Sequence, residues 1–316
     1  MAVGTALLTN TPNFLGQLFN ADQRRSQFLT IAGGTDGANA LITTNPEFPV
    51  SVRYNIGGGA QPSISENASM GALSPTFTVK SQAKNVIEIH QESVRISNLR
   101  KRATGRLSGI STAGQLPEMS DELAFQLGVQ ISKMKRDMNW TALNGVYADG
   151  GLTSSDVANQ TRGIITAIET NVVEGELNAE NIAELVRLVS DKGEFIMPMF
   201  FANSKNRVAI SKAYVVESLT VVDRDRFSGG VAVGKIVTEF GDVFIVTDND
   251  VPDDVILLAD MGLVKPVFTL DEDGDVISIK ALPTAGGETL ELYAEFGLDH
   301  NDEQCHAKLV IGEAGE

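Results

Sequence analysis

The chain has 316 residues, a formal net charge of −16 and a single cysteine, Cys305. This length allows one large domain or two smaller ones, with enough buried surface to fold without covalent staples. A single cysteine excludes an intrachain disulfide framework and is typical of a reducing compartment. No run approaches ~18 consecutive apolar residues, and no basic segment followed by an apolar one opens the chain. We therefore expect a soluble protein that is made and used without export and has no membrane partner.

The charge is unevenly placed along the chain. Residues 1–137 hold 13 Lys/Arg and 10 Asp/Glu, whereas residues 138–316 hold 12 and 31. An acidic half beside a mildly basic half permits electrostatic complementarity between neighbouring copies. The overall negative charge argues against a surface that wraps nucleic acid.

Residues 1–46 are polar and rich in small residues, so we expect an arm with little core of its own. One helical candidate, residues 15–29, contains Arg24 and Arg25, and the glycine-rich cluster at 33–37 is expected to end it.

Residues 47–82 carry the pattern of a long two-stranded hairpin. Apolar and polar residues alternate over 48–56 and again over 76–80, and glycines and prolines punctuate the loop between them. The apolar positions are Val50, Val52, Tyr54, Ile56, Phe77 and Val79. Such a hairpin is marginal alone in water, so it needs a partner. A further strand is expected over 86–96.

A long helix is predicted over residues 120–144, with Ser120 as its cap and Gly145 as its stop. Its apolar stripe, at steps of three and four, is Leu123, Leu127, Ile131, Met134, Met138 and Thr141. A second flank is formed by Phe125, Val129 and Trp140. With two apolar flanks, this helix is expected to pack on both sides.

The second half alternates helix and strand patterns. A second amphipathic helix is predicted over 178–190, followed by a buried strand over 195–201. Short β-rich runs then cover 231–233, 235–240, 243–247, 255–258 and 264–270.

The last part of the chain predicts three more strands. Residues 276–280 are expected to pair with 264–270 across the tight turn at Asp273-Gly274. Two further strands cover 288–298 and 307–311. The chain therefore reads as mixed α+β, with no internal repeat.

Gly229–Lys235 reads GGVAVGK and matches the spacing of a phosphate-binding loop. Ile236 follows where a metal-binding Ser or Thr is required, and a strand pattern follows instead of a helix. Without a helix N-terminus, the amide cradle and its dipole are missing. We interpret this segment as a glycine turn rather than a nucleotide site.

Asp271–Asp275 reads DEDGD and suggests calcium. An EF-hand loop needs glycine at its sixth position and glutamate at its twelfth, where this chain has Val276 and Leu282. We interpret the segment as a solvated hairpin tip.

His300, Cys305 and His306 cluster near the C-terminus. In an extended chain Cys305 and His306 face opposite ways, so a three-ligand zinc site would require the chain to fold over. His90, two residues from Glu88 on an expected strand, is interpreted as half of an exposed pair. No GxSxG or HExxH motif occurs. We expect no catalytic, cofactor-binding or metal-ligating residues, and no cofactor.

Two charged runs remain. The first consists of Arg95, Arg100, Lys101, Arg102 and Arg106. It fits a solvated face, ion pairs with the acidic half of a neighbouring copy, or nucleic-acid contact; the first two are favoured because aromatic interleaving is absent. The second, Asp223–Arg226, alternates in sign and is expected to form surface or interface pairs.

Taken in order, these features resemble the major capsid protein of tailed bacteriophages. The local stretches that carry the resemblance are ELAFQL at 122–127, KRD at 135–137, RGI at 162–164, LYAEFGL at 292–298 and HAK at 306–308. The resemblance spans nearly the whole chain and rests on the order of its parts.

The resemblance implies the Hong Kong-type capsid fold, an α+β fold shared with encapsulin shells. It also implies a division into an N-terminal arm (1–46), an extended hairpin loop (47–82), a peripheral domain (83–165) with a spine helix (120–144), an axial domain (166–265) and closing strands that return to the peripheral domain (266–316).

The implied function is structural: self-assembly into the icosahedral shell that encloses the genome of a tailed double-stranded DNA phage. The implied partners are other copies in hexamers and pentamers, a portal, and decoration or scaffolding proteins, with no sequence-specific DNA binding. The implied location is the virion capsid, after synthesis in the bacterial host cytoplasm.

We expect no long cleaved scaffolding segment ahead of the arm. Lys80 and Lys84 lie near the extended loop, and one known relative forms covalent crosslinks. The alternatives are an encapsulin-type compartment or an oligomeric enzyme that uses the turn at 229–235 or the tip at 271–275.

Overall fold

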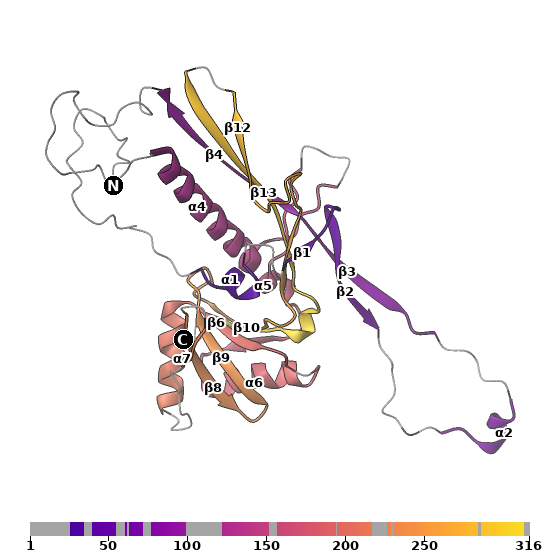
Figure 1. The fold of residues 1–316 in the computed structure, drawn as a ribbon. Helices are drawn as coiled ribbons and strands as arrows, with labels where there is room; N and C mark the ends of the chain where they lie inside the picture. Colours follow the sequence, from indigo (N-terminus) through magenta and orange to yellow (C-terminus); the bar gives the residue numbers. More distant parts are fainter. Residues whose placement is uncertain are drawn as a thin grey trace.

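In this computed structural model, the described residues are 26–34, 40–54, 61, 63–71, 77–98, 122–151, 157–193, 195–216, 226–228, 231–283 and 286–312. They form an α+β body from which a two-stranded hairpin projects (Figure 1). The body holds a five-stranded and a seven-stranded sheet. None of the described helices is long and apolar enough to cross a membrane.

The five-stranded sheet is organised around β13 (Gly287–Asp299). Strand β4 (Glu88–Ser97) runs antiparallel along one of its edges. The other edge takes β12 (Ser278–Leu282) and then β11 (Lys265–Phe268), and β1 (Leu41–Ile42) joins β11 in parallel.

The predicted pairing of residues 276–280 with 264–270 is wrong. Strand β13 is 13 residues long, so β12 pairs with its residues 289–293 and β11 with 296–299. The two shorter strands therefore follow one another along the same partner. The turn between them is exposed at 272–275, as expected for a solvated tip.

The seven-stranded sheet contains the remaining strands of the body. In spatial order these are β5 (Val172–Gly175), β14 (Ala307–Ile311), β10 (Val255–Asp260), β6 (Pro198–Ala202), β9 (Gly241–Thr247), β8 (Val231–Thr238) and β7 (Arg226–Ser228). The runs predicted separately at 231–233 and 235–240 thus form one strand, β8, which ends at Thr238.

One face of this sheet packs against α6 (Ala179–Ser190) and α7 (Ser204–Val216). Helix α6 confirms the prediction: the Asn178 side chain caps it by accepting from the Asn181 amide at 2.7 Å, and its apolar stripe is buried. Neither helix α7 nor its cap, Asn203, was predicted.

The other face joins a second core beneath α4 (Glu122–Asn144) and α5 (Ile164–Ala167). Alternation within single strands divides the two cores: Phe200 faces α6 and α7, whereas the next residue, Phe201, faces the second core. The seven-stranded sheet is therefore covered on both faces.

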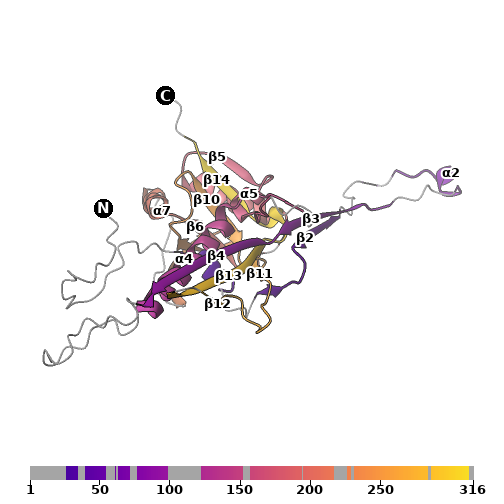
Figure 2. The ribbon, with the colours of Figure 1, turned by 90° about the horizontal axis from the view of Figure 1, so that it is seen from above.

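Helix α4 confirms the predicted long helix, and it lies along β4 and β13 (Figures 1 and 2). Met134 and Met138 are fully buried, whereas Leu127 and Ile131 are half-buried. The second flank is exposed in the single chain: Phe125 at 41%, Val129 at 46% and Trp140 at 54%. The expectation of packing on both sides is therefore not met within one subunit.

The expectation that residues 1–46 contribute little core is wrong for α1 (Phe28–Ala32). Phe28 and Leu29 are buried in the second core, and the ring of Phe28 meets that of Phe201 edge-on, with centroids 5.1 Å apart. Gly33, with φ of 142°, follows the helix at its predicted stop. Of the helix predicted at 15–29, residues 26 and 27 are not helical, and residues 15–25 lie outside the described residues.

Candidate functional site: the projecting hairpin and its anchor

The projecting hairpin pairs β2 (Glu47–Tyr54) with β3 (Lys80–Val86), with a register shift between Pro49 and Ser51. The short helix α2 (Glu66–Ser69) lies far from the body, beyond the ends of these strands (Figures 1 and 2). The second strand predicted at 76–80 is wrong, because the ladder uses 80–86. Alternation alone cannot show where pairing stops.

The root of the hairpin is anchored by apolar contacts. Phe48 and Val50 on β2 cluster with Ile87 and Val267. Gly297 on β13 leaves room for the Phe48 ring, since a Cβ atom at 297 would lie 2.7 Å from Phe48 Cε1. A larger residue at this position would displace the root of the hairpin.

A buried amide fixes the end of β3. The Asn85 side chain donates to the Leu298 carbonyl at 2.9 Å and to the Arg162 carbonyl at 3.1 Å. Its oxygen accepts from the Arg162 amide at 2.8 Å. Asn85 is fully buried, so leaving these groups unpaired would cost the desolvation of each. The amide thus ties the hairpin to both β13 and the segment that precedes α5.

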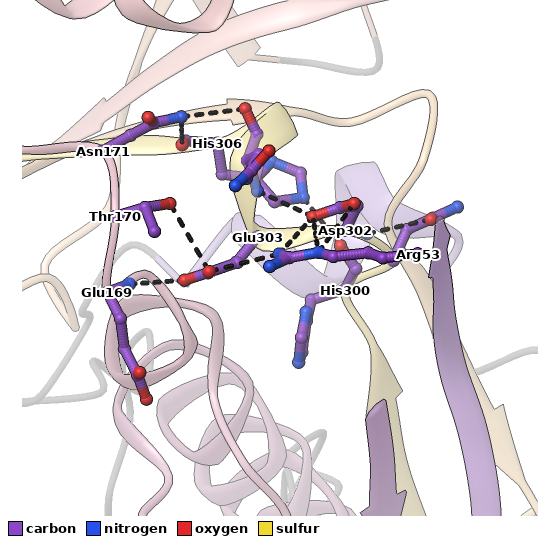
Figure 3. Close-up of polar contacts among 10 residues, drawn as sticks. Arg53, Glu169, Thr170, Asn171, His300, Asp302, Glu303 and His306 are labelled. Atoms are coloured by element: carbon purple, nitrogen blue, oxygen red, sulfur yellow. Dashed lines mark hydrogen bonds and ion pairs between the residues drawn. The ribbon is translucent and has the colours of Figure 1, made fainter. Parts of the chain in front are cut away.

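Arg53, further out on β2, binds the turn that follows β13 (Figure 3). Its Nε lies 2.8 Å and 2.9 Å from the two Asp302 oxygens, and its Nη2 lies 3.1 Å from Glu303 Oε1. The hydrogen bond to Asp302 raises the pKa of Arg53. Burial alone would raise the pKa of the Asp302 carboxyl, but hydrogen bonds from Arg53 and the Gln304 amide lower it.

This turn contains the short helix η1 (Glu303–Cys305) and is itself held by the body. Glu303 accepts from the Glu169 amide at 2.6 Å (Figure 3). The Asn171 side chain donates to the carbonyls of Gln304 and His306 at 2.8 Å and 3.0 Å. Arg53 therefore binds a turn that is itself held in place by the body, and this contact fixes the direction in which the hairpin leaves the body.

The His/Cys cluster noted in the sequence, His300, Cys305 and His306, lies in and beside this turn and helps to fix it. His306 Nδ1 accepts from the Asp260 amide at 3.1 Å, so its Nε2 carries the proton donated to the His300 carbonyl at 2.7 Å. Burial lowers the pKa of His306, which stays neutral. Cys305 is a free, half-buried thiol. Within the described ranges, no three His, Cys, Asp or Glu side chains are grouped to hold a metal.

The interpretation of Glu88 and His90 as an exposed pair is wrong. Their side chains are 23% and 9% exposed, because α4 covers this face of β4. His90 Nε2 lies 3.6 Å from Glu88 Oε1, and Glu88 accepts from the Thr161 amide at 3.2 Å. Burial raises the pKa of Glu88 and lowers that of His90. Lys133 on α4 pairs with Glu92 along the same seam.

The glycine-rich segment is not a phosphate cradle in its described part. Residues 231–235 lie within β8, and Lys235 Nζ pairs with Asp242 Oδ2 at 2.5 Å. Gly234 leaves space for the Arg207 guanidinium, which would lie 2.4 Å from a Cβ atom there. Gly229 and Gly230 lie outside the described residues.

The charged runs are described only in part. Arg95 is exposed on β4, whereas Arg100, Lys101, Arg102 and Arg106 lie outside the described residues. Of Asp223–Arg226, only the backbone of Arg226 is described, in β7.

Sequence reasoning missed the anchor of the hairpin. Arg53 and Asp302 are 249 residues apart, and no local motif links them. Asn85 offered one indirect signal, since a lone amide beside the apolar Val86-Ile87 pair suggests a buried, paired group.

A hairpin projecting from its root, a long helix laid along a five-stranded sheet, and a second α/β sheet together form the Hong Kong-type capsid fold. The chain is similar to the SrpI encapsulin of Synechococcus elongatus, with a TM-score of 0.60 and 14% identity over 96% of this chain and 92% of that one. It is also similar to the Cyanophage A-1(L) capsid, with a TM-score of 0.60 and 12% identity over 95% and 96%. It is similar as well to the capsid of an empty GTA particle, with a TM-score of 0.58 and 14% identity over 99% of this chain and 98% of that one.

The family model described as SU10 major capsid protein matches residues 2–312. The chain therefore belongs to the SU10 major capsid protein family, and it is a structural protein of phage shells, as the sequence resemblance implied. No match was found among curated proteins.

Proposed function

We propose that this chain assembles into a closed icosahedral shell of hexamers and pentamers around the double-stranded DNA genome of a tailed phage. Family membership over residues 2–312 and the capsid fold support this proposal. The chain acts without catalysis, cofactor or metal, and without sequence-specific DNA binding. It is made in the host cytoplasm, and its partners are other copies, a portal, and decoration or scaffolding proteins.

The observation that carries the proposal is the unpartnered apolar surface of the hairpin. On the outer half of β2, Val52 and Tyr54 are 55% and 60% exposed, and just before β3, Phe77 and Val79 are 87% and 82% exposed. Burying a side chain of this size contributes about 1.5–3 kcal/mol. Since the hairpin points away from its own body (Figure 1), a neighbouring subunit is the surface that can cover it.

We assign a role in the shell to each of the predicted domains. The extended hairpin, residues 47–82, lies across a neighbouring subunit, and the second flank of α4 contributes to the same class of contact. Residues 166–265 form an axial domain, and residues 83–165 with the closing strands 266–316 form a peripheral domain. Complementary charge between the two halves of the chain aids the alignment of neighbours.

Electron microscopy of the purified protein tests the proposal. Closed or partly closed shells are expected; discrete small oligomers would favour the oligomeric enzyme instead. An encapsulin compartment is the second candidate, because the SrpI encapsulin shares the fold. A portal or terminase gene beside the coding sequence supports the phage capsid, whereas a cargo enzyme gene there would support the compartment.

A further inference from the structure

A cavity of about 190 Å³ lies where the projecting hairpin meets the body. On the hairpin side it is lined by Ser51 and Arg53 of β2 and by residues 81–83 of β3. On the body side, its walls come from the segment 162–169 and from the turn at 300–303. A space of this size holds several water molecules, so it can also take a small ion.

The hairpin turns its polar face toward this cavity. In the β2–β3 ladder, Ser51 is paired with Ala83 and Arg53 with Ser81, so these four residues lie on one face of the ribbon. All four line the cavity, whereas the exposed Val52 lies on the opposite face. Among the described residues, the hydroxyls of Ser51 and Ser81 have no hydrogen-bond partner. Both hydroxyls are therefore available to donate to a ligand.

On the body side, His300 carries an unpartnered nitrogen. The residue is 6% exposed, and no described residue forms a hydrogen bond with its buried Nδ1. Its ring points away from Asp302 and His306 (Figure 3). Burial, with smaller contributions from the neighbouring His306 and Arg162, lowers the pKa of His300 to about 4, so the ring is neutral near pH 7. A neutral imidazole can carry its proton on Nδ1 and donate it, and a buried nitrogen without a partner is costly.

Arg162 brings a positive charge to the same space. It is half-buried, and its guanidinium carbon lies 5.1 Å from the centroid of the Tyr147 ring. This stacking covers one face of the guanidinium and leaves the N–H groups at its edge open. In the part of the chain that the structure describes, no carboxylate pairs with them. An oxyanion is the ligand that such an edge binds, through two parallel hydrogen bonds.

The carboxylates at the cavity are either occupied or turned away from it. Glu303 accepts from the Glu169 amide at 2.6 Å and from the Thr170 hydroxyl at 3.4 Å, and it pairs with Arg53. The Glu169 carboxylate is exposed and points away from Arg53 (Figure 3). The unused polar groups around the cavity are therefore chiefly hydrogen-bond donors.

We propose that this cavity binds a small oxyanion from solution, of the class of inorganic phosphate, between the hairpin and the body. Arg162 pairs with the negative charge, and the hydroxyls of Ser51 and Ser81 donate to the oxygens from the hairpin side. His300 Nδ1 donates from the body side. The bound ion adds a bridge to the anchor formed by Arg53, and it acts within one subunit, so it does not depend on shell formation.

Isothermal titration calorimetry of the full, unassembled chain with inorganic phosphate tests the proposal, at neutral pH and with ionic strength held constant by chloride. We expect saturable binding of one phosphate per chain, with an affinity about tenfold lower in R162Q. R187Q is the matched control. It removes the same charge from an exposed pair with Glu184 on α6, away from the residues that line the cavity, and should leave the affinity unchanged.

The S51A/S81A variant keeps every charge and should bind phosphate several-fold more weakly than wild type. Hydrogen exchange of the β2 amides provides a second measurement: phosphate should slow it several-fold in wild type and leave it unchanged in R162Q. Circular dichroism of each variant establishes that it is folded.

The proposal is overturned by an absence of saturable phosphate binding to wild type, which would leave the cavity to water. Equal affinity in wild type and in folded R162Q would overturn it as well, as would equal affinity in S51A/S81A should R162Q not fold. An equal loss in R187Q would also contradict it, because the ion would then respond to overall charge rather than to this cavity.

Discussion

The ring of Phe48 occupies the space that a side chain at position 297 would fill. A Cβ atom there would lie 2.7 Å from Phe48 Cε1 and 2.9 Å from Cζ. Since Phe48 lies at the root of the hairpin and Gly297 on the central strand of the five-stranded sheet, this contact joins the projecting element to the body.

Gly297→Ala should therefore weaken the root of the hairpin. The added methyl group forces the Phe48 ring or β13 to move, and overpacking of this kind costs about 1–3 kcal/mol of unfolding free energy. Urea denaturation of the unassembled protein measures the change. Gly128→Ala is the control: no atom lies within 4 Å of a Cβ there, and alanine in a helix interior should stabilise. Equal effects of the two substitutions would contradict the contact.

Arg53→Gln should loosen the outer anchor of the hairpin. The side chains of Arg53 and Asp302 are 36% and 27% exposed, so the expected loss is modest, about 1 kcal/mol or less, and it should shrink as salt rises. Lys84→Gln removes the more exposed pair with Glu47 and should have no measurable effect. Hydrogen exchange of the β2 amides is the readout. Unchanged exchange rates in Arg53→Gln would show that the ion pair does not hold the strand.

The two faces of α4 should respond differently to charge. Met138→Asp places an unpaired charge at a fully buried site and should cost several kcal/mol of a total of about 5–15. Phe125→Asp should change the monomer's stability by about 0.5 kcal/mol or less, because Phe125 is 41% exposed, yet it should impair assembly. Half-buried Leu127 and Ile131 should give intermediate losses. Thermal unfolding that ranks Phe125→Asp with Met138→Asp would contradict this assignment.

Comparing the predicted helices and strands with the observed ones indicates which parts of the fold could be predicted from the sequence. Helix α6 depends on local features, the Asn178 cap and a stripe at helical spacing, and it was predicted within one residue. Strand β12 pairs with β13, the strand that follows it in the chain, rather than with β11, which precedes it, so the local turn at 273–274 misled the prediction. Helix α7 lacks a clear apolar stripe, and only the cap Asn203 signalled it.

The same limit applies to the candidate site. The alternating pattern of β2 predicted that its apolar face needs a partner, because that follows from the residues themselves. It could not separate Phe48, which is buried within the subunit, from Tyr54, which is 60% exposed. Burial of His90 was likewise hidden, since it depends on where α4 crosses β4. Local chemistry was predictable, whereas contacts between distant segments were not.

The buried histidines should cause the free energy of unfolding to decrease as the pH is lowered. Burial lowers the pKa of His300 from 6.5 to about 4, so between these values the unfolded chain binds a proton that the folded chain does not. Its contribution is fully present above pH 6.5, and about 3 kcal/mol is lost as pH falls toward 4. Burial also lowers the pKa values of His90 and His306, so these two residues likewise lower the free energy of unfolding as the pH falls. Burial raises the pKa values of Asp248 and Glu88, so at acidic pH these two carboxyls bind protons more readily in the folded chain and increase its stability.

His300→Gln should flatten this dependence, because glutamine does not titrate. Urea midpoints of the unassembled protein at pH 7, 6 and 5 should converge in the variant relative to wild type. Parallel pH profiles of the two proteins would show that His300 titrates normally in the folded state.

The projecting hairpin is proposed to join neighbouring subunits rather than to complete the fold of its own subunit. Replacing residues 56–76 by an Asn-Gly turn removes the outer loop and leaves the root, with Phe48, Arg53 and Asn85, in place. Shortening a loop changes closure entropy only slightly, so the monomer should keep its circular dichroism spectrum and unfolding midpoint.

Assembly should fail, because the lost contacts recur at every subunit boundary. Sedimentation of the shortened protein beside wild type is the most direct measurement. We expect folded, unassembled subunits from the shortened protein and shells from wild type. Normal shells from the shortened protein would contradict it, as would unfolding, which would place the outer hairpin in the core of its own subunit.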